Sequence, residues 1–130
     1  MCPIPGPPVE AIPDATGPRS TCFTCSRLNA TTFAIVEADK WDELPIIYAK
    51  VYASMSVLVL IDTGCGGAAK DKSGELTSLR AFIETCAVTD NGGRPLNPAG
   101  EKDYVVICSH CHFDHIGTSE CQGSRGVPEY

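Results

Sequence analysis

The stretch Tyr-Val-Val-Ile-Cys-Ser-His-Cys-His-Phe-Asp-His-Ile-Gly occupies residues 104–117 and joins an apolar run to a cluster of polar side chains. Residues 104–108 are rich in β-branched side chains, which is typical of a buried β-strand. All three histidines of the chain follow within residues 110–115. Rigid sheets often present a site at the ends of their strands. The stretch therefore predicts both a sheet and the position of a functional site.

Further strands and one helix are predicted before this stretch. β-Forming residues predict strands over 32–37, 45–52 and 56–61, the last of them wholly apolar, as in a strand buried on both faces. Apolar residues at spacings of three and four predict a helix that begins near an N-cap at Ser73. Its apolar face would consist of Leu76, Leu79, Phe82, Ile83 and Cys86. The predicted fold class is α/β (α+β layered), with a mixed sheet and a helix.

Length and composition predict one folded domain with a tail. The 130 residues are 43% hydrophobic, which is enough for a core. Residues 1–20 hold six prolines and are expected to be a flexible tail, which leaves residues 21–130 for the domain. No signal peptide or transmembrane segment is recognised, so we expect a cytoplasmic protein with reduced cysteines and no membrane partner. A net charge of −6 without a basic cluster predicts no nucleic-acid partner.

The spacing of the histidine cluster suits metal binding. Side chains two residues apart in an extended loop point to the same side, so His110 and His112 can hold one ion. Asp114 shares that parity, and His115 can turn to a neighbouring position. Imidazole nitrogens and carboxylate oxygens suit Zn²⁺. Two such ions about 3.5–4 Å apart can share and activate a water molecule.

The chain resembles the metallo-β-lactamase superfamily through two motifs. One is the His-x-His-x-Asp-His loop at 110–115, and the other is the apolar strand that ends in the turn Asp-Thr-Gly at 62–64. The resemblance implies an αββα sandwich and a zinc-dependent hydrolase with a small-molecule substrate, such as an ester, lactone or thioester. It implies that metal-bound hydroxide is the nucleophile. Carried over residue by residue, it implies His110 and His112 as ligands of one zinc ion, Asp114 and His115 as ligands of the second, and Asp62 and Asp114 as catalytic residues.

The match extends over roughly residues 30–120, which correspond to the N-terminal half of that sandwich. The later metal ligands of the family have no counterpart, because residues 116–130 contain no histidine. We therefore expect a truncated, partial domain with incomplete zinc sites and little or no hydrolysis. One face of the sheet, formed by alternate residues of 57–61 and 105–107, would then be uncovered, and self-association through this face is expected.

Three other interpretations stay open. Cys22-x-x-Cys25 and Cys108-x-x-Cys111 are pairs of the kind found in structural zinc sites, although they lie far apart in the sequence. The first pair could serve redox chemistry instead, although no helical pattern follows it. The third interpretation is a non-catalytic interaction or pseudo-enzyme fragment, whose exposed sheet pairs with another chain.

Overall fold

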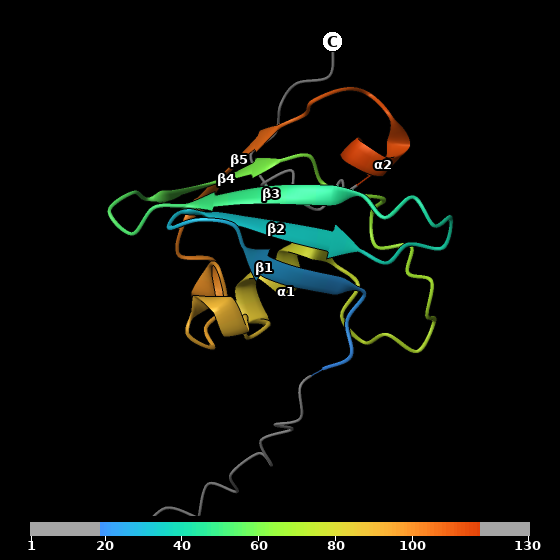
Figure 1. The fold of residues 1–130 in the computed structure, drawn as a ribbon, viewed down its shortest axis with the longest axis horizontal. Helices are drawn as coiled ribbons and strands as arrows, with labels where there is room; N and C mark the ends of the chain where they lie inside the picture. Colours follow the sequence, from blue (N-terminus) through green and yellow to red (C-terminus); the bar gives the residue numbers. More distant parts are fainter. Residues whose placement is uncertain (1–18, 118–130) are drawn as a thin grey trace, which may run out of the picture.

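The computed structural model describes residues 19–117, in which five strands form one open, mixed sheet (Figure 1). The strands lie in the sheet in chain order. Neighbours are antiparallel from β1 to β4, and β5 joins β4 in parallel. A parallel neighbour requires a crossover connection, which residues 62–102 supply. The strands are β1 (Phe23–Arg27), β2 (Thr32–Glu37), β3 (Ile46–Val51), β4 (Val57–Ile61) and β5 (Asp103–Ile107).

The helices of the described residues are short. The crossover contains α1 (Leu79–Thr85), and α2 (Phe113–Ile116) follows β5. Two 3₁₀ turns, Thr89–Asn91 and Pro98–Gly100, lie between α1 and β5. The mixed sheet with its helices confirms the predicted α+β class. Within residues 19–117, no helix is long and apolar enough to cross a membrane.

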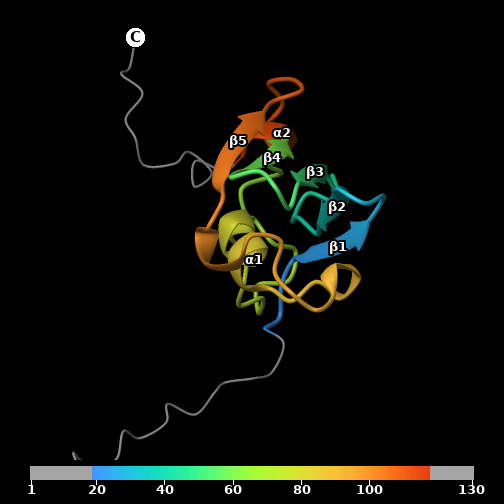
Figure 2. The same cartoon turned by 90° about the vertical axis from the view of Figure 1, so that its left-hand side faces the viewer.

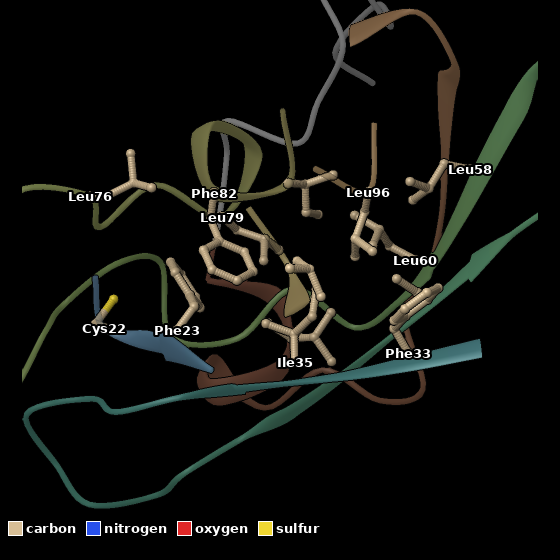
Figure 3. Close-up of a cluster of buried hydrophobic side chains, with 14 residues drawn as sticks. Cys22, Phe23, Phe33, Ile35, Leu58, Leu60, Leu76, Leu79, Phe82 and Leu96 are labelled. Carbon is tan, nitrogen blue, oxygen red and sulfur yellow. The ribbon is translucent and has the colours of Figure 1, made fainter. Parts of the chain in front are cut away.

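The core lies between one face of the sheet and α1 (Figure 2). Alternate residues of β2, β3 and β4 point to this side because side chains along a strand alternate between its two faces. Phe33, Ile35, Ile47, Leu58 and Leu60 are each at most 1% exposed. They meet Leu79, Phe82 and Ile83 of α1, together with Leu76, Val88 and Leu96 (Figure 3). Burying each such side chain stabilises the fold by about 1.5–3 kcal/mol.

The opposite face of the sheet carries no covering layer in the described part of the chain. Val105 and Ile107 of β5 are 43% and 51% exposed, and Ile46 and Tyr48 of β3, on the other side of β4, are also exposed. The alternate residues of β4 are half-buried. Within residues 19–117, the face is therefore uncovered, as the sequence leads us to expect. The expectation that strand 56–61 is buried on both faces was wrong, because only Leu58 and Leu60 are fully buried.

The helix begins later than the sequence predicts. Its N-cap is Ser78, whose hydroxyl accepts a hydrogen bond from the Ala81 amide at 3.3 Å, and not Ser73. Both the amide and the hydroxyl of Ser73 donate to Asp71 Oδ1, at 2.9 and 2.7 Å. The Leu76 amide donates to the Ser20 carbonyl, so this segment pairs with the start of the chain and does not coil. A contact distant in the sequence thus overrides the local helical pattern.

The N-terminal boundary is only partly visible. The tail predicted for residues 1–20 lies almost wholly outside the described residues, so the division at residue 20 stays a prediction. The ordered sheet begins with β1, a strand that the sequence did not predict. It is an edge strand that pairs with β2, and Phe23 packs on Phe82 with ring centroids 5.2 Å apart.

Two buried carboxylates at the end of β2 organise the neighbouring loops. Glu37 Oε2 accepts a hydrogen bond from the Cys65 amide at 2.6 Å, and Oε1 accepts one from the Gly67 amide at 3.0 Å. Burial raises the pKa of Glu37. Asp39 accepts bonds from the amides of Trp41, Glu43 and Leu44 at 2.8–3.3 Å. Burial alone would raise its pKa, but these three amides hold the pKa of Asp39 below its ordinary value.

We expect Asp39→Asn to lower the free energy of unfolding by about 2 kcal/mol at pH 7, because charged hydrogen-bond acceptors in a buried site become neutral. The folded-state pKa of Asp39 is depressed, so its stabilisation is present above the unfolded pKa of about 3.9 and is lost as the pH falls through the folded value. The difference between the two proteins should therefore shrink below about pH 4. Urea unfolding across this pH range measures it.

The matched control is Asp42→Asn. Asp42 lies in the same loop and forms an exposed ion pair with Lys70, and such pairs contribute little. An equal loss of stability in both variants would show that the amide contacts of Asp39 do not organise the loop.

Candidate functional site

The parallel pairing of β4 and β5 creates the candidate site. Ile61 is the partner of Ile107, so both strands end at the same edge of the sheet. The chain continues into Asp62 from β4 and into residues 108–117 from β5. The Asp62 amide donates to the Ile107 carbonyl at 2.8 Å and extends the pairing by one residue. The polar residues that follow the two strands are thereby brought together.

Asp62 is the centre of this cluster. Its φ of 64° lies in the left-handed region, which aspartate tolerates better than most residues. Its carboxylate accepts hydrogen bonds from the Ser109 amide and hydroxyl, both at 2.7 Å, and lies 2.8 Å from His115 Nδ1. Burial would raise the pKa of Asp62, but its bonds with Ser109 and His115 hold the pKa below its ordinary value. Asp62 is therefore an ionised anchor for the loop that follows β5.

The hydrogen bonds fix how the imidazoles are oriented. The single hydroxyl proton of Ser109 is donated to Asp62, so Ser109 Oγ can only accept from His110 Nδ1, which lies 2.8 Å away. The His110 ring contacts the ring of His112 at 4.5 Å and that of His115 at 4.0 Å between centroids. His115 Nε2 lies 3.1 Å from Asp114 Oδ2. The three histidines thus form one packed cluster beside two carboxylates.

The backbone of the loop is fixed as firmly as its side chains. The Thr63 amide and hydroxyl both donate to the His115 carbonyl, at 2.8 and 3.2 Å. The Gly117 amide donates to the Gly64 carbonyl at 2.9 Å. A Cβ on Gly117 would lie 2.4 Å from the Cys65 carbonyl carbon, so only glycine allows this approach. The turn after β4 and the loop after β5 therefore form one unit.

This arrangement does not fit the zinc pair expected from the sequence. Among residues 19–117, no group of three or more histidine, cysteine or carboxylate side chains is placed to hold a metal ion. Each ring nitrogen of His115 already faces a carboxylate oxygen, and both oxygens of Asp62 are engaged by Ser109. The predicted residues His110, His112, Asp114, His115 and Asp62 do lie together, but Asp62 and Asp114 face the ring nitrogens of His115.

Sequence reasoning missed two contributors to the cluster. Ser109 links Asp62 to His110, and its position directly after the strand and inside the histidine motif was the available signal. The Trp41 ring, 48% exposed, contacts the Phe113 ring of α2 at 5.2 Å between centroids. Because Trp41 belongs to the loop between β2 and β3, no local pattern connects it to α2.

The two Cys-x-x-Cys pairs do not form a shared site. Cys25 lies in β1 and Cys22 directly precedes that strand, whereas Cys108 and Cys111 follow β5. β1 and β5 are opposite edges of the five-stranded sheet. The alternative of a zinc module built from both pairs was therefore wrong.

Comparison with known proteins gives one informative relative. A protein of Aspergillus versicolor named "Putative transcription factor avaE" is 49% identical to this chain over 105 residues. The match covers 80% of this chain and 30% of the relative, so the chain spans less than a third of that protein's length. No family model matches the chain. No solved structure matches it either.

These findings correct the functional prediction. The assignment to the metallo-β-lactamase superfamily was wrong, because no family model matches and the relative carries the name of a transcription factor. The prediction of a zinc-dependent hydrolase was wrong for the same reason, and because residues 19–117 contain no group placed to hold a metal. No catalytic role is therefore assigned to Asp62 or Asp114.

We expect Asp62→Ala to release the loop after β5. The variant loses three side-chain contacts and places alanine in a left-handed conformation, so the free energy of unfolding should fall by about 2–3 kcal/mol. The Ser109 amide donates a hydrogen bond to Asp62 at 2.7 Å, and in the variant this amide should exchange its hydrogen much faster. Hydrogen exchange followed by mass spectrometry measures this.

Asp71→Ala is the control, because Asp71 accepts two bonds from Ser73 at an exposed turn. It should leave exchange at Ser109 unchanged. Unchanged exchange in Asp62→Ala would contradict the anchoring role of Asp62.

Proposed function

We propose that this chain is a protein-interaction module of a gene-regulatory protein and that it associates with a second copy of itself through the uncovered sheet face. The observation that carries the proposal is this face, because its exposed apolar side chains line up across neighbouring strands. The name of the relative from Aspergillus versicolor supports a regulatory setting. A cytoplasmic or nuclear location belongs to the same proposal.

The chain's charge favours a protein partner over DNA. Binding to duplex DNA depends on lysines and arginines that neutralise phosphates. This chain has a net charge of −6, with ten basic residues scattered through it. In a regulatory protein more than three times as long as the matched segment, other segments would then contact DNA.

The register of the strands shows how the apolar residues gather. Tyr48 pairs with Ile61, which pairs with Ile107, and these three side chains form a row across β3, β4 and β5. Val59 and Val105 lie in the next row. Exposed apolar surfaces of this kind mark interaction sites when they exceed a few hundred Å². The sheet face therefore has the composition of an interface core.

Two charged residues on this face favour a second copy as the partner. Lys50 is the partner of Val59 in the sheet, and Asp103 is the partner of Val57, so both point to the uncovered side. Neither forms an ion pair within residues 19–117. In a two-fold symmetric dimer, if residue i of one copy contacts residue j of the other, then residue j of the first also contacts residue i of the second. Lys50 of each copy can therefore pair with Asp103 of the other copy, which gives two ion pairs per dimer.

We expect the purified chain to form dimers in a concentration-dependent manner and Val105→Glu to shift it to monomers, because two buried carboxylates would face an apolar surface. Sedimentation velocity over a range of concentrations measures this. Ala87→Glu is the control: Ala87 is exposed and follows α1, which packs on the covered face of the sheet, so dimers should persist.

Charge exchange tests the orientation of the copies. Lys50→Asp and Asp103→Lys should each weaken association, and the double variant should restore it. A wild-type chain that stays monomeric at all concentrations would refute the proposal, as would tight, salt-sensitive binding of duplex DNA by a monomer.

Zinc binding by His110, His112, Asp114 and His115 stays a prediction. Only His110 and His112 have a ring nitrogen that does not face a carboxylate in the structure, and two ligands are too few for a closed zinc site. We therefore expect weak binding that a chelator reverses. Competition with a chromophoric zinc indicator measures it, with His112→Ala as the variant. Tight uptake of two ions per chain would contradict this expectation.

A further inference from the structure

The two Cys-x-x-Cys segments share a spacing but differ in backbone conformation. Phe23 and Thr24, which separate Cys22 from Cys25, are strand residues of β1. Three residues of extended strand span about 10 Å, whereas a disulfide requires Cα atoms within about 7 Å. The first pair therefore cannot close without breaking the strand.

The second pair lies where the chain turns. β5 ends at Ile107, directly before Cys108, and the backbone bends at both Ser109 and His110 before it reaches Cys111. Two successive bends bring the ends of a four-residue segment toward each other, as in a β-turn. Asp62 maintains the first bend, because it accepts bonds from both the amide and the hydroxyl of Ser109. Cys108 and Cys111 are therefore the first and last residues of a bent segment, whereas strand residues separate Cys22 from Cys25.

The two cysteine pairs also differ in their exposure to solvent. Cys108 and Cys111 are both exposed. Cys22 is buried and Cys25 is half-buried, and burial raises the pKa of each of these two thiols to about 11. The thiolate is the nucleophile in disulfide exchange, so Cys22 and Cys25 are poorly reactive at neutral pH.

We propose that Cys108 and Cys111 form a redox pair that closes reversibly into an intraloop disulfide when it meets a small disulfide such as oxidised glutathione. This inference is independent of self-association. One thiolate, after losing its proton to solvent, attacks the glutathione disulfide, forms a mixed disulfide and releases one glutathione. The second thiolate then attacks the protein sulfur of the mixed disulfide and releases the other glutathione. Two protein thiols are oxidised, and one glutathione disulfide is reduced to two thiols.

A disulfide between Cys108 and Cys111 would close a ring of the backbone next to the histidine cluster and change the surroundings of that cluster. His110 lies inside the ring and contacts the other two imidazoles. Phe113 follows Cys111 by two residues and contacts Trp41, the only tryptophan of the chain. The fluorescence of Trp41 therefore reports on the loop without an added label.

The test equilibrates the full, reduced chain in glutathione buffers of increasing oxidised fraction. The reaction is then quenched with acid, and free thiols are alkylated under denaturing conditions. Peptide mass mapping should show a disulfide between Cys108 and Cys111, a loss of two alkylatable thiols, and full reversal by reduced glutathione. Trp41 fluorescence should change along the same transition.

Variants assign the chemistry to the pair. Cys108→Ser and Cys111→Ser should each abolish the intraloop disulfide and the fluorescence change. The matched pair Cys22→Ser and Cys25→Ser should leave both intact, and circular dichroism checks that each variant folds. Thiols that all remain reduced in oxidising buffer would overturn the proposal, as would a disulfide that joins either loop cysteine to Cys2, Cys22, Cys25 or Cys121.

Discussion

The parallel pairing of β5 with β4 is the constraint on which the rest of this structure depends. It requires the long crossover that carries α1 onto one face of the sheet, and it makes two strands end at the same edge. Asp62 and the histidine loop meet there only because Ile61 and Ile107 are in register. The same crossover covers one face and, among residues 19–117, nothing covers the other, so the core, the polar cluster and the uncovered face have a common origin.

Charge organises the loops of this chain, while apolar packing holds the sheet. Three carboxylates in the described part of the chain are buried: Glu37, Asp39 and Asp62. Each accepts a hydrogen bond from at least one backbone amide of a loop. The pKa of Glu37 is raised, whereas the pKa values of Asp39 and Asp62 are lowered. Burial is the largest effect on each group: at Glu37 it outweighs two amide hydrogen bonds and is reinforced by the negative charge of Asp39, whereas at Asp39 and Asp62 the hydrogen bonds outweigh it. The geometry of these loops is thus linked to the protonation state of the three carboxylates.

Local pattern predicted the parts of the fold that are locally determined. The strand at 32–37 agrees with β2 residue for residue, because its β-branched run needs no distant partner to be recognised. The helix start was misplaced because Ser20, far away in the sequence, binds residues 75 and 76. β1 was missed because Phe23–Arg27 contains no run of apolar β-forming residues, and its pairing with β2 defines it. The resemblance implied that Asp62 and His115 belong to one site, and the two side chains do lie in contact. Their bonds to Ser109 and Asp114 were not predicted, since spacing says nothing about which groups face each other.

The order in which β5 joins the sheet also bears on how the chain folds. β1 to β4 form a meander of neighbouring strands, so their contacts close short loops. β5 pairs with β4 only after residues 62–102 have been drawn in, which is a contact of long sequence separation and therefore a slow one. Residues 108–117 depend on that last pairing. We therefore expect the histidine loop to form late in folding and to open early in local unfolding.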